Sequence, residues 1–443
     1  MQEEKEDLIL KTLSKIFIII LIGIFFSIML RFLTKNILID KMKIDNKVIK
    51  AIAENNGDNG NIKINWKEEY PIQQKEKSDN KIDFFTKYTN KVESVKKQLE
   101  KYSSDFLFGY EKIVEIAKGY ENTIKWNLIT NTDQNTPIYI GDNYWSDVTQ
   151  REDYSYKTDN IIEFSKYLKG KNIDFIYVQA PKKTQDLQNV EMLNIYEDYT
   201  NKNINDVINS LKENGIEVLD LREKIREEKL NIKELFYKVD HHWTPQTAIW
   251  AMRHIASEMN EKWNMNIDLE LYNNEKYYTI SLEKNYLGSQ GRKLTLSKVE
   301  PEKFDIVLPS FETKLTVSIP ESNIKNYTGN VYETLFDKRC LYTNDYYKSK
   351  SYDAYGYNSK AMIHVKNNNI NNNEKVLLLA DSFSGALMPY MSLGVSDIYR
   401  IDLRDFDGSV KSFIEKNDIS KVMMLYYPGS FSAKAAEALF EYE

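Results

Sequence analysis

The stretch DHHWTP brings a carboxylate and two imidazoles together just ahead of an expected helix. Thr244 is a good helix N-cap and the proline after it suits the first helical position, so the apolar spacing predicts a helix over 245–260. From the loop before that helix, Asp240 can fold back onto Nδ1 of His242. This contact would fix the imidazole tautomer and leave Nε2 free as a base. The alternative is a solvated loop in which the histidines are incidental.

A serine follows a strongly apolar segment much later in the chain. The sequence VLLLADSFSG predicts a buried strand that ends at Ala380 and a helix that begins near Ser384. Ser382 would then lie at the carboxyl edge of a parallel strand, where the N–H groups of the helix start can bind an oxyanion. The alternative is that Asp381 or Ser382 merely caps the helix.

Together the two stretches could supply a nucleophile, a base and a carboxylate that orients the base. Serine is a poor nucleophile unless a base removes its proton, and the chain has only four histidines from which that base can come. The sequence therefore offers Asp240, His242 and Ser382 as a candidate relay for acyl transfer.

A metal site is the competing interpretation of the first stretch. Asp240, His241 and His242 all carry possible ligand atoms, but adjacent histidine side chains usually diverge. The sequence shows no HExxH pattern and no second cluster of Asp and His, and its single cysteine excludes a Cys-rich zinc site. We therefore expect neither a metal nor a cofactor.

The composition is that of a folded chain. Of its 443 residues, 42% are hydrophobic and 13% aromatic, which excludes wholesale disorder. The formal net charge of -6 argues against a strongly basic nucleic-acid binder, so no nucleic-acid partner is expected.

From about residue 137 onward, apolar strands alternate with amphipathic helices. This alternation predicts an α/β fold with a mainly parallel sheet flanked by helices. The alternation breaks between about 267 and 370, which we interpret as an inserted segment of mixed or β character. The expected helices cover 161–171, 204–215 and 245–260, and the expected strands cover 173–179, 216–221, 375–380, 396–403 and 421–427.

The first 35 residues indicate an N-terminal membrane anchor. Residues 16–30 contain no charge, and apolar neighbours with snorkelling lysines extend this run to the length of a membrane-spanning helix. A cleaved signal peptide is the alternative, although no small-x-small cleavage site follows. We expect a polar stalk and helical linker over 36–130 and an α/β domain over 131–443. The Lys and Arg counts on the two sides of the anchor do not fix its orientation.

These stretches resemble a known group of proteins. DHHWTP followed far downstream by a strand ending in DSF is similar to the DHHW proteins, relatives of the AlgX and AlgJ alginate O-acetyltransferases and of the SGNH hydrolase superfamily. YIGDNYW (139–145) and IYVQAPKK (176–183) resemble further motifs of these domains, and NYLGSQGRK (285–293) resembles their small-residue loop. The resemblance covers about 135–443.

The resemblance implies a role for each candidate residue. Ser382 would be the nucleophile, His242 the general base and Asp240 the group that orients it. Their order along the chain is permuted relative to ordinary SGNH esterases, in which the serine comes first. Gly288 would contribute a second oxyanion donor, and His241 would line the substrate site.

The resemblance also implies work on the outer side of the membrane. Members of the group act beside a membrane-bound O-acyltransferase that passes acyl groups outward. We therefore expect an anchored, extracytoplasmic O-acyl transferase, with acetyl as the expected group, acting on a cell-surface or exopolysaccharide glycan. An acetyl esterase with the same triad and a non-catalytic glycan-binding or assembly protein stay open. The C-terminal stretch MMLYYPGSF differs from the Glu- and Arg-bearing segment of the alginate enzymes, which argues against alginate as the substrate.

Overall fold

The structure is a computed structural model that describes residues 137–185, 198–341, 345–348, 350–370, 374–432 and 434–442. The predicted anchor (1–35) and the predicted stalk and helical linker (36–130) lie outside these residues. Within the described ranges, no helix has the length and apolar character needed to cross a membrane.

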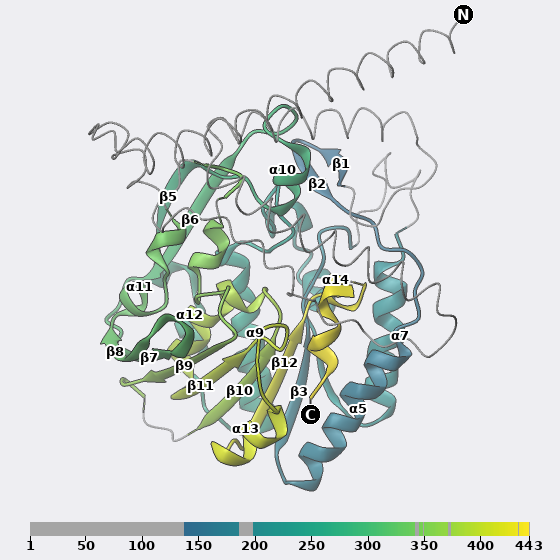
Figure 1. Ribbon diagram of the computed structural model, residues 1–443, viewed down its shortest axis with the longest axis vertical. Coiled ribbons are helices and arrows are strands. Elements are labelled where there is room, and N and C mark those ends of the chain that lie inside the picture. Colours follow the sequence, from purple (N-terminus) through teal and green to yellow (C-terminus); the bar gives the residue numbers. More distant parts are fainter. Residues whose placement is uncertain are drawn as a thin grey trace, which may run out of the picture. The chain divides into compact units, whose positions relative to one another are not determined.

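An eight-stranded mixed sheet forms the centre of the fold, in the order β4-β3-β12-β10-β11-β9-β7-β8 (Figure 1). Its first five strands pair in parallel, and its last three join by antiparallel pairing. The parallel strands are β3 (Asp174–Gln179), β4 (Glu217–Asp220), β10 (Lys375–Ala380), β11 (Asp397–Ile401) and β12 (Lys421–Tyr426). The antiparallel strands are β7 (Leu315–Ile319), β8 (Ile324–Gly329) and β9 (Met362–Asn367).

Helices cover both faces of the parallel half of the sheet. On one face, α5 (Ser155–Gly170), α7 (Thr200–Glu213) and α13 (Val410–Lys416) share a core with Leu377 and Leu379 of β10. On the other face, α9 (Pro245–Trp263) and α12 (Ser384–Gly394) share a core with the alternate residues of the same strand. Because successive side chains of a strand point to opposite faces, burial of both faces explains why β10 is apolar almost throughout.

Shorter elements complete the described part of the chain. The hairpin of β1 (Ile138–Gly141) and β2 (Tyr144–Ser146) precedes α5, and a separate ribbon pairs β5 (Tyr277–Tyr286) with β6 (Glu302–Pro309). The short helix α10 lies between the two strands of this ribbon along the chain. The remaining α-helices are α8 (Leu221–Glu227), α10 (Ser289–Leu294), α11 (Val331–Thr334) and α14 (Pro428–Ser432).

The predicted α/β class is confirmed, and the sheet differs from its prediction in one respect. Residues 267–370 were predicted to form an inserted segment of mixed or β character. In the structure they also supply the antiparallel strands β7, β8 and β9 of the central sheet. In β7, buried side chains alternate with partly exposed ones, since helices cover only one of its faces. The sequence of β7 therefore shows only a short alternation of apolar and polar residues. The parallel strands, in contrast, were identified by continuous apolar runs.

Candidate active site

The histidine-bearing loop is closed by backbone hydrogen bonds at its base. Phe236 and Trp243 form an isolated antiparallel bridge, and the Thr244 N–H donates to the Leu235 carbonyl at 2.9 Å. The predicted cap is confirmed, because the Thr244 hydroxyl accepts the N–H of Thr247 at 3.3 Å and Pro245 opens α9. Asp240, His241 and His242 thus occupy the tip of a short loop that leads directly into a helix.

The serine-bearing turn follows β10 at the carboxyl end of its parallel neighbours. Asp381 does not act as a simple helix cap, since its carboxylate is buried and bridges two segments. Its Oδ1 accepts the N–H of Phe383 at 2.9 Å, and its Oδ2 accepts the N–H of Tyr427 and the hydroxyl of Ser430, each at 2.7 Å. Burial raises the pKa of Asp381, while these donors favour its charged form. The turn that presents Ser382 is therefore fixed to the C-terminal segment of the chain.

The three side chains that the sequence offered as a relay lie together in the structure. His242 Nε2 is 2.8 Å from Ser382 Oγ, and His242 Nδ1 is 2.5 Å from Asp240 Oδ1, although 140 residues separate the histidine from the serine. The carboxylate of Asp240 also accepts the N–H of His242 at 2.8 Å and that of Ser289 at 2.5 Å. This geometry allows a proton to pass between the hydroxyl and the imidazole while the carboxylate holds the ring.

The electrostatics of Asp240 suit that arrangement. Burial alone would raise its pKa, but His242, His241 and the Ser289 N–H together outweigh burial and hold the pKa of Asp240 well below its usual range. The side chain is only 2% exposed. A carboxylate that stays ionised in such surroundings can stabilise a positive charge on the neighbouring imidazole.

Aromatic side chains enclose His242 and connect its loop to the serine turn. The buried Trp243 donates its Nε1–H to the carbonyl of Phe383 at 3.1 Å, next to the serine. Tyr352 stacks on the imidazole of His242 with ring centres 3.8 Å apart and ring planes 11° apart. Phe383 lies against the same imidazole at 5.4 Å. The ring therefore has little room to rotate away from its partners.

The two tentative substrate residues lie beside this arrangement. His241 Nδ1 is 2.6 Å from Ser289 Oγ, its side chain is 27% exposed, and burial together with His242 lowers the pKa of His241, so it is neutral at pH 7. Gly288 packs against Asp240, and a Cβ at this position would lie 2.2 Å from the Asp240 Cβ. Glycine is thus required here by the close approach of two backbone segments, and its role as an oxyanion donor stays a prediction.

The structure also bears on the metal interpretation. One ligand atom from each of Asp240, His241 and His242 can be chosen so that all lie within 4.8 Å of one another. These side chains are already engaged by protein partners, with Asp240 on His242 and Ser289, His242 on Ser382, and His241 on Ser289. The arrangement matches a hydrogen-bonded relay better than a set of ligands that converge on one ion.

Sequence reasoning missed several residues that support the relay. Tyr352 comes from the region interpreted as an insertion, where no pattern marked it. Asp381 was considered only as a cap, and Lys183 was noticed only as part of the stretch IYVQAPKK. The sequence carried no signal for Lys183 beyond its place in that stretch, because its burial, which is rare for lysine, is visible only in the structure.

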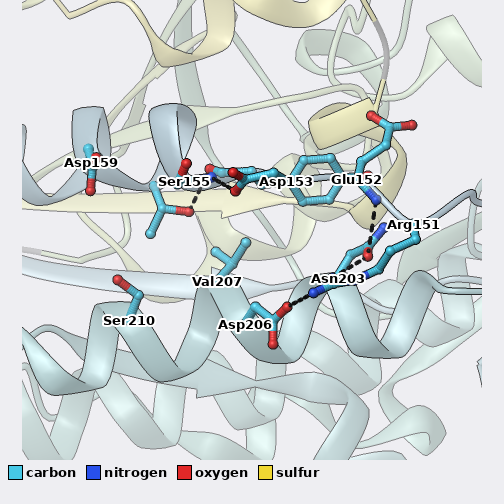
Figure 2. Close-up of a pocket in the computed structure, with 11 residues that line it drawn as sticks. Arg151, Glu152, Asp153, Ser155, Asp159, Asn203, Asp206, Val207 and Ser210 are labelled. Carbon is cyan, nitrogen blue, oxygen red and sulfur yellow. Dashed lines mark hydrogen bonds and ion pairs between the residues drawn. The ribbon is translucent and has the colours of Figure 1, made fainter.

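A concave region separate from the relay lies between α5 and α7 (Figure 2). Its cavity volume is about 310 Å³, and four carboxylates and one guanidinium line it. Arg151 pairs with Asp206 at 2.6 Å and donates to Asn203 Oδ1 at 2.7 Å. Figure 2 shows Ser155 and Asp159 of α5 across from Asp206, Val207 and Ser210 of α7. The residues that line this cleft include no histidine, and none of them belongs to the relay.

The fold is an SGNH-hydrolase-like α/β fold with a mixed central sheet. Residues 139–301 match the family model described as the SGNH hydrolase-like domain of the acetyltransferase AlgX. The expected resemblance to DHHW and AlgX-like proteins is thereby confirmed. No curated protein sequence matches the chain.

Solved structures agree with this fold. Bacillus cereus PatB1 superposes with a TM-score of 0.56 at 20% identity, covering 70% of this chain and 100% of PatB1. A structure of PatB1 with a sulfonyl adduct gives a TM-score of 0.52 at 19% identity, covering 69% of this chain and 99% of that one. A DHHW family protein from Eubacterium siraeum DSM 15702 gives a TM-score of 0.52 at 17% identity, covering 69% of this chain and 97% of that one. At these identities the likeness establishes the fold.

Proposed function

We propose that this protein is an O-acyl transferase that moves an acetyl group to a glycan hydroxyl by a Ser-His-Asp mechanism. The observation that carries the proposal is the continuous relay from Asp240 Oδ1 through the His242 ring to Ser382 Oγ, with contacts of 2.5 and 2.8 Å. Acyl transfer through an activated serine needs this set of groups within hydrogen-bond reach.

In the first half of the reaction, Ser382 Oγ attacks the carbonyl carbon of the donor ester. His242 Nε2 takes the hydroxyl proton and then gives it to the departing oxygen of the donor, which leaves an acyl ester on the serine. In the second half, His242 Nε2 takes the proton of the acceptor hydroxyl as its oxygen attacks that ester. The proton returns to Ser382 Oγ when the serine leaves. Asp240 stays ionised throughout and stabilises the imidazolium.

The oxyanion that forms in each half needs donors near the serine. The N–H of Ser382 has no hydrogen-bond acceptor within the described residues and follows directly from the strand end, so we assign it as the first donor. Gly288 is proposed as the second. His241, neutral, partly exposed and 3.8 Å from the His242 ring between ring centres, is proposed to contact the acceptor.

The choice of substrate class follows from the family match. The matching model is that of an acetyltransferase domain, which supports acetyl as the transferred group and a polysaccharide as the acceptor. The sequence-based anchor and the resemblance to AlgX-like proteins support an extracytoplasmic domain on a single-pass membrane protein, supplied by a membrane-bound O-acyltransferase. Protease treatment of whole cells tests this placement, since an extracytoplasmic domain is digested and a cytoplasmic one is protected.

An acetyl esterase with the same triad is the second candidate, because water can replace the sugar hydroxyl in the deacylation step. Incubating the protein with an activated acetyl ester, with and without a glycan acceptor, separates the two. A transferase forms acetylated glycan and releases less free acetate when the acceptor is present, whereas an esterase releases the same acetate in both. Failure to find acetate on Ser382 by mass spectrometry after rapid quenching would exclude both.

A further inference from the structure

A buried lysine binds the loop that carries Asp240. Lys183 follows β3, is only 1% exposed, and donates from Nζ to the carbonyl oxygens of Lys238 at 3.0 Å and Asp240 at 2.8 Å. The carbonyl of Trp145 at 2.5 Å and Gln290 Oε1 at 3.0 Å also lie within hydrogen-bond distance of Nζ, so four oxygens share the three N–H groups of the ammonium. One side chain thus connects β3, the β1–β2 hairpin, α10 and the loop of the candidate triad.

A carboxylate binds the amide groups of the same loop. Glu302, at the start of β6, accepts the N–H of Lys238 at 3.0 Å and the N–H of Val239 at 2.9 Å. The carbonyl of Val239 accepts the N–H of Gly291 in α10 at 2.8 Å. Every backbone donor and acceptor of residues 238 and 239 therefore has a partner, which leaves the approach to Asp240 little conformational freedom.

Lys183 is buried and Glu302 is partly buried, and desolvation shifts the pKa of both groups. Burial lowers the pKa of Lys183 to about 7, and the carboxylates of Glu302, Asp240 and Asp147 oppose that shift. Burial raises the pKa of Glu302 to about 7, and the two loop N–H groups and Lys183 oppose it. Burying an ammonium is unfavourable unless several acceptors surround it, and an apolar side chain of similar size often stabilises a fold equally well. The charge at this position therefore calls for a functional reason.

We propose that Lys183 and Glu302 are positioning residues that hold the Asp240 loop, and through it the imidazole of His242, in the orientation that the Ser382 hydroxyl requires. This role presupposes the catalytic function proposed above. It also gives a physical reason for the joint occurrence of four stretches of the sequence. GDNYW supplies the Trp145 carbonyl, PKK the ammonium, DHHW the bound carbonyl of Asp240, and GSQGRK the side chain of Gln290.

The decisive variant is Lys183→Met, which keeps an unbranched side chain one atom shorter and removes the charge and the donors. A displacement of about 1 Å at the reacting groups lowers kcat by about 10²-fold, so we expect kcat to fall 10- to 100-fold with KM nearly unchanged.

Lys182→Met is the matched control. Lys182 is also buried, and its Nζ binds Thr149 at 2.7 Å, Thr200 at 3.3 Å and Asp147 at 3.3 Å, with no contact to the 238–240 loop. We expect it to lose comparable thermal stability while kcat stays within about threefold of the unaltered protein. Equal losses of kcat in the two lysine variants would overturn the proposal.

Two readouts on the full chain do not depend on the glycan. The low-field imidazole N–H resonance of the His242–Asp240 hydrogen bond should be lost or shifted in Lys183→Met, and sulfonylation of Ser382 by phenylmethylsulfonyl fluoride should slow 10- to 100-fold. If Lys183→Met does not fold, Glu302→Gln tests the carboxylate that binds the same loop. We expect sulfonylation of Ser382 to slow about threefold to tenfold in this variant. An unchanged resonance and labelling rate would refute the positioning role, whereas a wild-type Ser382 that labels but transfers no acetyl group would refute only the proposed function.

Discussion

The relay at the edge of the sheet and the cleft between α5 and α7 are opposites in construction. In the relay, Asp240 is 2% and His242 7% exposed, and the two side chains hydrogen-bond each other and their neighbours. In the cleft, the Arg151–Asp206 pair has side chains 43% and 57% exposed. The cleft has a volume of about 310 Å³ and several charges, whereas the relay has convergent groups of matched chemistry.

Under the proposed mechanism, the reacting groups lie in the buried relay and not in the charged cleft. An exposed ion pair is weakened by water and salt, and its partners can exchange it for solvent at little loss. A buried relay has no such exchange, because each group that loses its partner remains desolvated. Substitutions in the two regions should therefore differ in effect by several orders of magnitude.

The largest effect is expected for Ser382→Ala. Loss of the hydroxyl removes the nucleophile, so transfer of acetyl from an activated ester should fall at least about 10³-fold. Because the alanine fits the space of the serine without its hydroxyl, thermal unfolding should change little. A variant that keeps more than a tenth of the wild-type rate would contradict the proposed mechanism.

Asp240→Asn should come next, with a loss of about 10²- to 10⁴-fold. The carboxylate accepts N–H groups from both His242 and Ser289, so an asparagine must turn its own amide donor toward one of them. If it faces the imidazole, the ring adopts the other tautomer and Nε2 can no longer accept the serine proton. Steady-state kinetics beside a crystal structure of the variant would separate this effect from a displaced loop.

The same substitution should change how stability depends on pH. The pKa of Asp240 is held well below its usual range in the folded protein, so below about pH 4 the unfolded chain binds a proton that the folded chain does not. Unfolding is therefore favoured as the pH falls through that window. Melting temperatures measured between pH 5 and pH 2 should fall more steeply in the unaltered protein than in Asp240→Asn, and parallel curves would contradict this account.

A smaller effect is expected for the ring that covers the imidazole. Tyr352→Leu removes the aromatic face stacked on His242, which stabilises the imidazolium in the transition state, so kcat should fall about 10-fold. Tyr352→Phe keeps the ring and should stay within about twofold of the wild type. Equal losses in the two variants would assign the contribution to the hydroxyl instead of the ring.

The smallest effect is expected in the cleft. Arg151→Gln removes an exposed pair with Asp206 that contributes at most about 1 kcal/mol to stability. Acetyl transfer should stay within about twofold of the wild type, and the melting temperature should shift by no more than a few degrees. A loss of activity comparable to that of Tyr352→Leu would show that the cleft takes part in the reaction. The relay and the cleft would then no longer differ in function.

The sequence predicted the parts of the site that depend on local chemistry. Thr244 and Pro245 marked the start of α9, and the apolar run before Ser382 marked the end of a buried strand, because capping and burial leave strong local patterns. These signals located the two loops correctly along the chain. The contact between them required only that both loops lie at the edge where parallel strands end.

The remaining features depend on contacts between distant segments, for which the chain carries no local pattern. Tyr352 reaches His242 from a region without clear periodicity, and Glu302 is one of 66 acidic residues until the fold brings it to Val239. The antiparallel strands were predicted only as a segment of mixed or β character, without their place in the central sheet, for a related reason. A strand buried on one face, such as β7, resembles an ordinary amphipathic loop over five residues.

The hydrogen bond from the Trp243 indole to the Phe383 carbonyl has a consequence for fidelity. It joins the two loops through groups of the chain itself, so under the proposed mechanism the serine is already positioned when an acceptor arrives. A site assembled in advance cannot reject a poor acceptor by failing to close around it. Water, the smallest acceptor, could then react with the same acyl ester on Ser382 as a sugar hydroxyl does. Slow hydrolysis of the acyl ester to free acetate is therefore expected, and it is the residues around Ser382 that must limit it.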